Sequence, residues 1–223
     1  MRIVILKMGT TEPSVVVRYG DYDQWFRGVF ESLGCEVEVL PVFQGGGLPA
    51  TLEADGLVLT GSPLSVRQEE PWMREVGDWT LEQARCGVPV LAICFGHQLL
   101  GECLGARVEE NPNGPEWGSI EVECVADPLF EGLPGTLDVQ ASHRDILVGL
   151  PDGVTLLASN ENTEIQAYAW GAHVRAVQFH PEARAEVIQA LLEARGLPGS
   201  TKVSGHGVRI LSNWVNHWIR KAS

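Results

Sequence analysis

The chain has 223 residues, of which 44% are hydrophobic and 20% charged, which is enough for one large packed domain or two small ones. Its formal net charge of −13 argues against nucleic acid as a partner, because an acidic surface repels phosphate backbones. No apolar stretch approaches the ~18 residues of a membrane span, and the N-terminal apolar run is too short for a signal peptide. We therefore expect a cytoplasmic protein without a membrane partner.

The first half of the chain alternates predicted strands with predicted helices. Continuous apolar runs predict strands over residues 2–8, 36–42, 55–61 and 88–94. Helical spacing of apolar side chains predicts helices over residues 22–34, 71–87 and 97–105. This alternation predicts an α/β fold with a mostly parallel central sheet covered by helices on both faces.

The second half begins with short strand-like runs separated by Gly, Pro and Asn turns. These runs cover residues 107–110, 119–125, 137–142, 154–159, 165–170 and 173–179. We expect a small antiparallel addition, with the last run rejoining the central sheet. Helices are predicted over 183–196 and 208–222, joined by a flexible connector over 197–207. Since no segment resembles an interdomain linker, residues 1–223 are expected to form a single domain.

The chain has five cysteines, at positions Cys35, Cys86, Cys94, Cys103 and Cys124. Because the number is odd and no C-x-x-C pair occurs, we expect neither a disulfide framework nor a zinc site. In a reducing compartment all five are free thiols, and most buried thiols act only as small hydrophobic side chains. A functional cysteine must therefore be recognised from its neighbourhood.

Cys94 has such a neighbourhood, because the apolar run before it stops there and a helix-like segment follows. In parallel α/β sheets, ligands bind at the carboxyl ends of strands. A strand–nucleophile–helix turn projects the side chain from the sheet, and Gly96 permits close packing beneath it. The helix N-terminus favours a thiolate, and the Phe95 N–H is free to face an oxyanion.

A partner for this thiol is found in AVQFHPE, residues 176–182, at the end of another apolar run. His180 and Glu182 are two residues apart, and in an extended segment such residues point to the same side. A carboxylate beside an imidazole fixes its tautomer and stabilises the protonated form. The alternative is a solvent-facing strand end, but an elbow and H-P-E together are far more specific than either alone.

These motifs resemble those of the class I, triad-type glutamine amidotransferases. AICFGHQLLGECLGA is similar to the family's nucleophile motif, VQFHPE to its closing motif, and LTGSPLSV (59–66) to its oxyanion loop. VQASHRD and DPLFEGLP resemble further family segments, and VQASHRD is most like the amidotransferase domain of GMP synthetase. The resemblance covers residues 1 to about 185 and implies a flavodoxin-like fold.

The resemblance also implies roles for individual residues. Cys94 becomes the nucleophile, His180 the general acid and base, and Glu182 its orienting partner. The backbone N–H groups of Ser62 and Phe95 form the oxyanion hole. Contacts to the substrate fall on Gly61, Gln98, Ser142 and His143, with Ser142 and His143 on a loop whose backbone holds the α-amino acid end. The implied hydrolysis needs no metal and no cofactor.

Two residues depart from the family pattern. Ala92 stands two residues before the cysteine, where the family usually has glycine, and this is expected to tighten the elbow. Ser62 stands where glycine is frequent in the oxyanion loop. Because the loop acts through its backbone, the donor survives, but the peptide flip expected of this loop is restricted.

Three functions are compatible with these motifs. The first is a glutamine amidotransferase that releases ammonia for a separate synthetase subunit. The second is a stand-alone γ-glutamyl hydrolase or peptidase, favoured by the stretch from Ala183 to Arg209 and by a connector that is expected to border the leaving group. The third is a regulatory relative without activity, which the complete triad disfavours. The loops at Ser62 and Ser142 favour the first.

Overall fold

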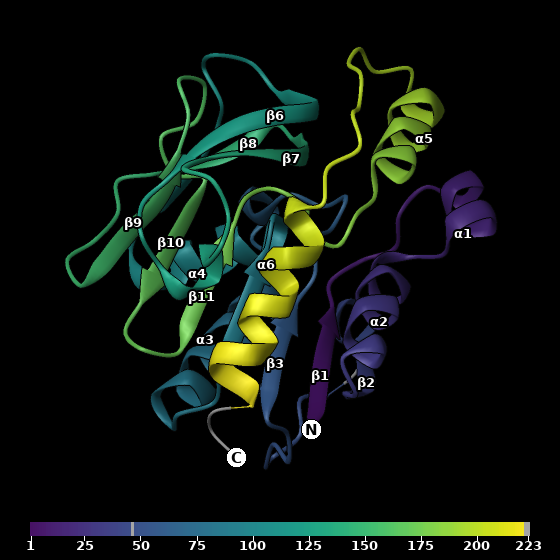
Figure 1. Ribbon diagram of the computed structural model, residues 1–223. Helices are drawn as coiled ribbons and strands as arrows, with labels where there is room; N and C mark the ends of the chain where they lie inside the picture. The colour runs from purple at the N-terminus through teal and green to yellow at the C-terminus, as the bar shows by residue number, and fades with distance from the viewer. Residues whose placement is uncertain (46, 221–223) are drawn as a thin grey trace.

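One large sheet forms the centre of the protein in this computed structural model, which describes residues 1–45 and 47–220. Its nine described strands lie in the order β2-β1-β3-β4-β11-β10-β9-β6-β7 (Figure 1). The five parallel strands are β1 (Arg2–Lys7), β2 (Glu36–Pro41), β3 (Gly56–Leu59), β4 (Val90–Ile93) and β11 (Val174–Val177). The antiparallel strands are β6 (Glu116–Cys124), β7 (Thr136–His143), β9 (Val154–Ser159) and β10 (Ala167–Trp170).

The predicted α/β architecture is confirmed, including the return of the last strand to the central sheet. β11 pairs in parallel with β4, the strand that leads into Cys94. The four antiparallel strands β10, β9, β6 and β7 continue the central sheet, so most of the predicted antiparallel addition belongs to that sheet. A separate two-stranded sheet joins β5 (Arg107–Glu110) to β8 (Asp145–Val148), and β8 was not predicted from the sequence.

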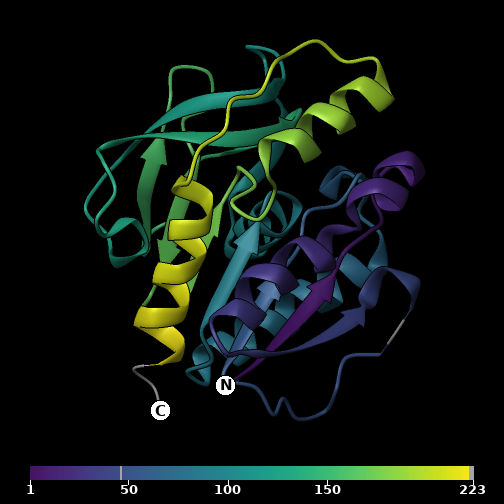
Figure 2. The same ribbon diagram turned by 45° about the vertical axis from the view of Figure 1, so that its right-hand side comes forward.

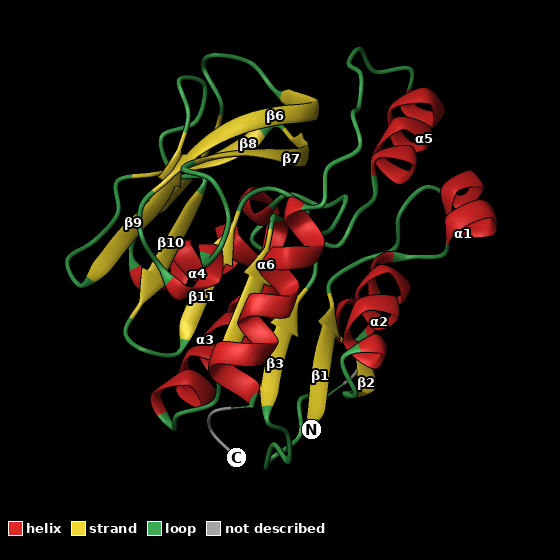
Figure 3. Ribbon diagram, in the orientation of Figure 1, coloured by secondary structure: helices red, strands yellow, loops and turns green. Residues whose placement is uncertain are grey.

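Helices cover both faces of the parallel strands, as Figures 2 and 3 show. The described helices are α1 (Pro13–Tyr19), α2 (Tyr22–Ser32), α3 (Pro71–Arg85), α4 (Phe95–Leu104), α5 (Ala185–Arg195) and α6 (His206–Trp214). α2 and α6 pack on one face, whereas α3 and α4 pack on the other. Because successive side chains of a strand point to opposite faces, Ile3 and Ile5 join the first core, and Val4 and Leu6 join the second.

The helix α1 was not predicted, because its sequence PSVVVRY is rich in β-branched residues of low helix propensity. Pro13 fits the first turn of this helix, where a missing N–H is harmless. The buried side chain of Val15 packs with Val187 and Leu191 of α5 in a third small core. Tertiary packing therefore overrides local preference in this segment.

The C-terminal region differs from the prediction in two ways. The predicted connector over 197–207 is irregular only as far as residue 205, because α6 begins at His206, and the irregular part is hydrogen-bonded to β6 and β7. The Ser119 N–H donates to the Ser200 carbonyl (3.0 Å), and Gln140 Nε2 donates to the Lys202 carbonyl (3.1 Å). The last helix ends at Trp214 and continues as one π-helical turn, Val215–Ile219, while the predicted end at 221–222 lies outside the described residues. No described helix is both long and apolar enough to cross a bilayer.

Trp214 is the largest fully buried side chain and holds α6 against the sheet. Its ring lies 5.9 Å from that of Phe30, and a Cβ at Gly56 would lie 2.8 Å from the indole. We expect Trp214→Ala to lower the free energy of unfolding by about 3–5 kcal/mol, because it leaves a large cavity between α6 and β3. Urea unfolding measures this, with Val17→Ala as the control, since Val17 is 89% exposed. Equal stability of the two variants would contradict the packing.

Candidate active site

Cys94 occupies the junction between the end of β4 and the start of α4. Its backbone has φ of 49° and ψ of −98°, a conformation that costs about 1–3 kcal/mol and persists only where the surroundings hold it. The Cys94 N–H donates to the Val177 carbonyl of β11 (2.9 Å), and the Gln98 N–H donates to the Cys94 carbonyl (3.0 Å). The predicted strand–cysteine–helix turn is therefore present, with the cysteine itself in the strained position.

Two glycines allow close packing around this turn. A Cβ at Gly96 would lie 2.6 Å from the Leu59 Cβ and 3.0 Å from the Leu59 carbonyl oxygen, so glycine lets α4 approach β3. A Cβ at Gly61 would lie 2.8 Å from Cε1 of His180. Gly61, expected from the resemblance to contact substrate, thus lies against the imidazole ring.

His180 and Glu182 lie together in the segment after β11. His180 Nδ1 lies 2.8 Å from Glu182 Oε1, and both side chains are almost fully buried. The His180 N–H donates to the Gln140 carbonyl (2.8 Å), and the Tyr22 ring stacks on the imidazole at 6.4 Å between centroids. The pairing predicted from the two-residue spacing is confirmed.

The charges around His180 keep its imidazole protonated at neutral pH. Burial alone would lower the pKa of His180, but the negative charge of Glu182 and the charge and hydrogen bond of Cys94 raise that pKa to about 10. The His180–Glu182 pair therefore contributes its full stabilisation of the folded protein below pH 6.5, the ordinary pKa of histidine. This contribution is lost as the pH rises through about 10. A protonated imidazole beside the sulfur stabilises a thiolate.

Ser62 and Phe95, the predicted oxyanion donors, border the same cavity as Cys94. Phe95 is the first residue of α4, so its N–H has no acceptor within the helix. Among the described residues, no hydrogen bond uses the N–H of Ser62 or that of Phe95. Both donors are therefore available to an oxygen bound beside Cys94.

Gln98 lies on α4, and its amide orientation is fixed by two acceptors. Its Nε2 donates to the Asp145 carbonyl (2.7 Å) and to Gln178 Oε1 (3.0 Å). Both N–H groups are therefore used, and no hydrogen bond among the described residues uses its carbonyl oxygen, which is left free to accept one. This suits a donor on a bound ligand, such as an ammonium group.

Ser142 and His143 occupy the end of strand β7, which corrects the prediction that they lie on a loop. The continuous pairing of β7 with β6, Trp117 opposite Ser142 and Glu116 opposite His143, accounts for the difference. His143 Nε2 lies 3.0 Å from Glu116 Oε2, and its Nδ1 lies 3.2 Å from the Asp145 carbonyl. His143 is thus held from both sides at the wall of the cavity.

Glu116 is the centre of a buried polar cluster that the sequence did not reveal. Besides contacting His143, its carboxylate accepts from Asn160 Nδ2, Thr163 Oγ1 and Gln166 Nε2, each at 2.7 Å. Burial alone would raise the pKa of Glu116, but His143, Thr163 and Asn160 lower it to about 2. Its partners lie 27 to 50 residues away, so no local pattern indicates this role.

Six of the predicted site residues border one cavity of about 320 Å³: Ser62, Cys94, Phe95, Gln98, Ser142 and His143. Three arginines and two carboxylates also border it, namely Arg67, Arg144, Arg195, Glu110 and Asp145. Arg144 is exposed and has no ion-pair partner among the described side chains. Sequence reasoning did not single out Arg144 or Asp145 as site residues. Both belong to the segment VQASHRD, directly after Ser142 and His143, and this closeness in sequence could have identified them.

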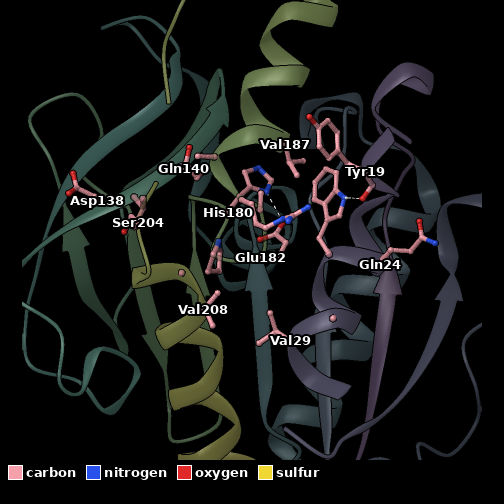
Figure 4. Close-up of a pocket in the computed structure, with 18 residues that line it drawn as sticks. Tyr19, Gln24, Val29, Asp138, Gln140, His180, Glu182, Val187, Ser204 and Val208 are labelled. Atoms are coloured by element: carbon pink, nitrogen blue, oxygen red, sulfur yellow. Dashed lines mark hydrogen bonds and ion pairs between the residues drawn. The ribbon is translucent and has the colours of Figure 1, made fainter. Parts of the chain in front are cut away.

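His180 and Glu182 are not on the lining of the Cys94 cavity but border a second cavity, of about 360 Å³, on whose lining Cys94 does not appear. Figure 4 shows the dyad between Tyr19 and Gln24 on one side and Asp138 and Gln140 on the other. The connector borders this cavity through Ser204 and Gly207, and its residues 196–207 are absent from the lining of the Cys94 cavity. The connector therefore borders the cavity beside His180 and not the one beside Cys94, and its expected place beside the leaving group stays a prediction.

Histidine, cysteine and carboxylate side chains can also bind metal ions when three or more of them lie close together. Within residues 1–45 and 47–220, no group of three or more such side chains is arranged to hold a metal ion.

Comparison with known proteins gives one family and several relatives. The family model described as "Glutamine amidotransferase class-I" matches residues 15–195. A glutamine-hydrolyzing GMP synthase of Thermomicrobium roseum is 38% identical over 178 residues, which are 77% of this chain and 32% of the relative. The chain thus spans about a third of that relative's length.

Two further relatives match over most of their own length. One subunit of the glutamine-hydrolyzing GMP synthase of Saccharolobus solfataricus is 32% identical over 167 residues, which are 74% of this chain and 86% of the relative. The crystal structure of a glutamine amidotransferase from Thermotoga maritima has a TM-score of 0.74 at 26% identity, covering 88% of this chain and 82% of that one.

The Glu116 cluster gives a prediction for stability. Because its pKa is lowered, Glu116 stabilises the fold above pH 4.5, and this contribution is lost as the pH falls through about 2. We expect Glu116→Gln to cost about 3 kcal/mol of unfolding free energy at pH 7, and about half of that at pH 3. Urea unfolding at both pH values tests this, with Glu123→Gln, exposed on the same strand, as the control. A loss independent of pH would show that the charge of Glu116 is not the cause.

Proposed function

The chain belongs to the class I glutamine amidotransferases, and on this premise we propose that it hydrolyses the side-chain amide of glutamine through Cys94, His180 and Glu182. The observation that supports this most is the strained Cys94 at the N-terminus of α4, with the buried His180–Glu182 pair beside it. Nucleophile, proton carrier and orienting carboxylate are the three parts that acyl transfer requires.

In the first half-reaction, the Cys94 thiolate attacks the side-chain amide carbon of glutamine. The N–H groups of Phe95 and Ser62 hold the oxygen that becomes negative in the tetrahedral intermediate. His180, protonated at neutral pH, gives its proton to the departing nitrogen, and ammonia leaves. The product that stays on the enzyme is a γ-glutamyl thioester of Cys94.

In the second half-reaction, His180 takes a proton from water, and the resulting hydroxide attacks the thioester carbon. The same oxyanion donors act again, and glutamate and the thiolate are released. Glu182 keeps the proton-carrying nitrogen of His180 directed away from itself and towards the reacting atoms. The cycle restores the starting state without a metal or a cofactor.

The cavity also suits the amino-acid end of the substrate. The Gln98 carbonyl oxygen is placed to accept from an α-ammonium group, and Arg144 is available for an α-carboxylate. Ser142 and His143 shape the wall between them, and Gly61 sets the edge near His180.

The ammonia released needs an acceptor, and we propose that a separate synthetase subunit supplies it. The similarity to a single subunit of a GMP synthase supports such an arrangement, with residues 1–223 acting as one amidotransferase domain. A catalytic thiol must stay reduced, so we place the protein in the cytoplasm.

Hydrolysis of larger γ-glutamyl compounds is a second candidate. Trp117 of β6 and Arg195 of α5 border the Cys94 cavity and offer surface to a leaving group larger than ammonia. Steady-state kinetics of the purified chain on glutamine and on a γ-glutamyl dipeptide distinguishes the two candidates. Glutamine turnover that rises when a synthetase is added supports the amidotransferase, whereas fast dipeptide hydrolysis with poor glutamine turnover supports the hydrolase.

We expect a glutamine-analogue electrophile to label Cys94 and no other cysteine, because only Cys94 lies beside free N–H donors and a protonated histidine. Peptide mass spectrometry locates the label. Cys94→Ser should abolish both labelling and hydrolysis, and Cys86→Ser, at an exposed cysteine, is the matched control. A label on Cys35, Cys86, Cys103 or Cys124 instead of Cys94 would refute the assignment.

His180→Ala should be nearly inactive, because both half-reactions need its proton. Glu182→Gln should retain more activity, but the alkaline limb of its kcat/KM profile should move to lower pH, since the charge that raises the pKa of His180 is gone. The profile is measured between pH 6 and about 10 on glutamine. Near-normal turnover in His180→Ala, or an unmoved alkaline limb in Glu182→Gln, would contradict these roles.

A further inference from the structure

The Gly61–Ser62 peptide carries one of the two oxyanion donors, and its orientation is fixed by a neighbouring hydroxyl. The carbonyl of Gly61 accepts from Thr60 Oγ1 at 2.8 Å. Because the C=O and N–H of a trans peptide point in opposite directions, this bond directs the Ser62 N–H away from Thr60. Ser62 itself borders the Cys94 cavity.

The hydroxyl of Thr60 has no freedom to turn away from this carbonyl. It accepts from the N–H of Met8, the residue after β1, at 3.0 Å. A hydroxyl has a single hydrogen, so that hydrogen is left for the Gly61 carbonyl. Thr60 is completely buried, so solvent cannot replace either partner.

Ser62 fastens the same peptide from its other side. Its Oγ donates to the Met8 carbonyl at 3.0 Å and accepts from the Leu64 N–H at 3.1 Å. Both backbone groups of Met8 are therefore bonded to hydroxyls of the oxyanion loop. A flip of the Gly61–Ser62 peptide would break the Thr60 bond and leave a buried hydroxyl hydrogen without an acceptor.

We propose that Thr60 is a positioning residue, which fixes the Gly61–Ser62 peptide so that the Ser62 N–H faces the Cys94 cavity before substrate binds. This inference rests on the proposed hydrolysis of a γ-glutamyl amide. A donor that is already oriented requires no reorganisation when charge develops on the substrate oxygen, so Thr60 contributes to the rate and not to substrate affinity.

The test compares Thr60→Val, which keeps the shape but removes the hydroxyl, with Thr60→Ser, which keeps the hydroxyl. On glutamine and on γ-glutamyl-p-nitroanilide, we expect Thr60→Val to lose about tenfold or more in kcat with KM unchanged. Thr60→Ser should regain most of the loss. Thr80→Val is the matched control, because Thr80 is equally buried and its hydroxyl has no hydrogen-bond partner among the described residues.

Alkylation of Cys94 by iodoacetamide separates positioning from a general structural effect, because this displacement forms no oxyanion. The rate of alkylation should be the same in wild type and Thr60→Val. Wild-type kcat in Thr60→Val overturns the inference, as does a loss of kcat that is matched by slower alkylation and not restored by Thr60→Ser. No turnover of either substrate by an alkylation-competent wild type would instead overturn the proposed function itself.

Discussion

The backbone of Cys94 is the constraint on which the site depends. A positive φ at a non-glycine residue turns the chain from β4 into α4 without an intervening loop, and it leaves the thiol at the carboxyl end of the central strands. This turn depends on two contacts. The Cys94 N–H bonds to the last residue of β11, and Gly96, which has no side chain, lets α4 pack closely against Leu59 of β3. The same two requirements bring His180 and the oxyanion loop to the thiol, because His180 follows β11 and the loop follows β3.

Buried charge in the site is neutralised locally, although the chain as a whole carries a net charge of −13. Glu182 is balanced by a protonated His180, whereas the carboxylate of Glu116 contacts His143 and accepts hydrogen bonds from three uncharged side chains. Such pairs are a weak source of stability but a strong source of fixed geometry. They hold the imidazole of His180 next to Glu182 and that of His143 next to Glu116. Three arginines and two carboxylates border the Cys94 cavity, so positive and negative side chains lie together there.

The sequence predicts those parts of the structure that depend on local pattern. Apolar runs indicated β1 to β4, and the joint between a strand and a helix singled out Cys94 from five cysteines. It does not reveal Glu116, whose partners come from distant segments, or α1, whose helix exists through packing on α5. Thr60 was also missed, because its role arises from a contact with Met8 on a different strand end.

The central claim is that the thiol of Cys94 carries the γ-glutamyl group between the two half-reactions. Acid quenching of the wild-type chain during turnover of isotopically labelled glutamine, followed by peptide mass spectrometry, tests it most directly. The account predicts labelled γ-glutamyl on the Cys94 peptide, released by hydroxylamine as expected of a thioester. Glutamate formed at the full rate with no label on Cys94, or with the label on another residue, would contradict it.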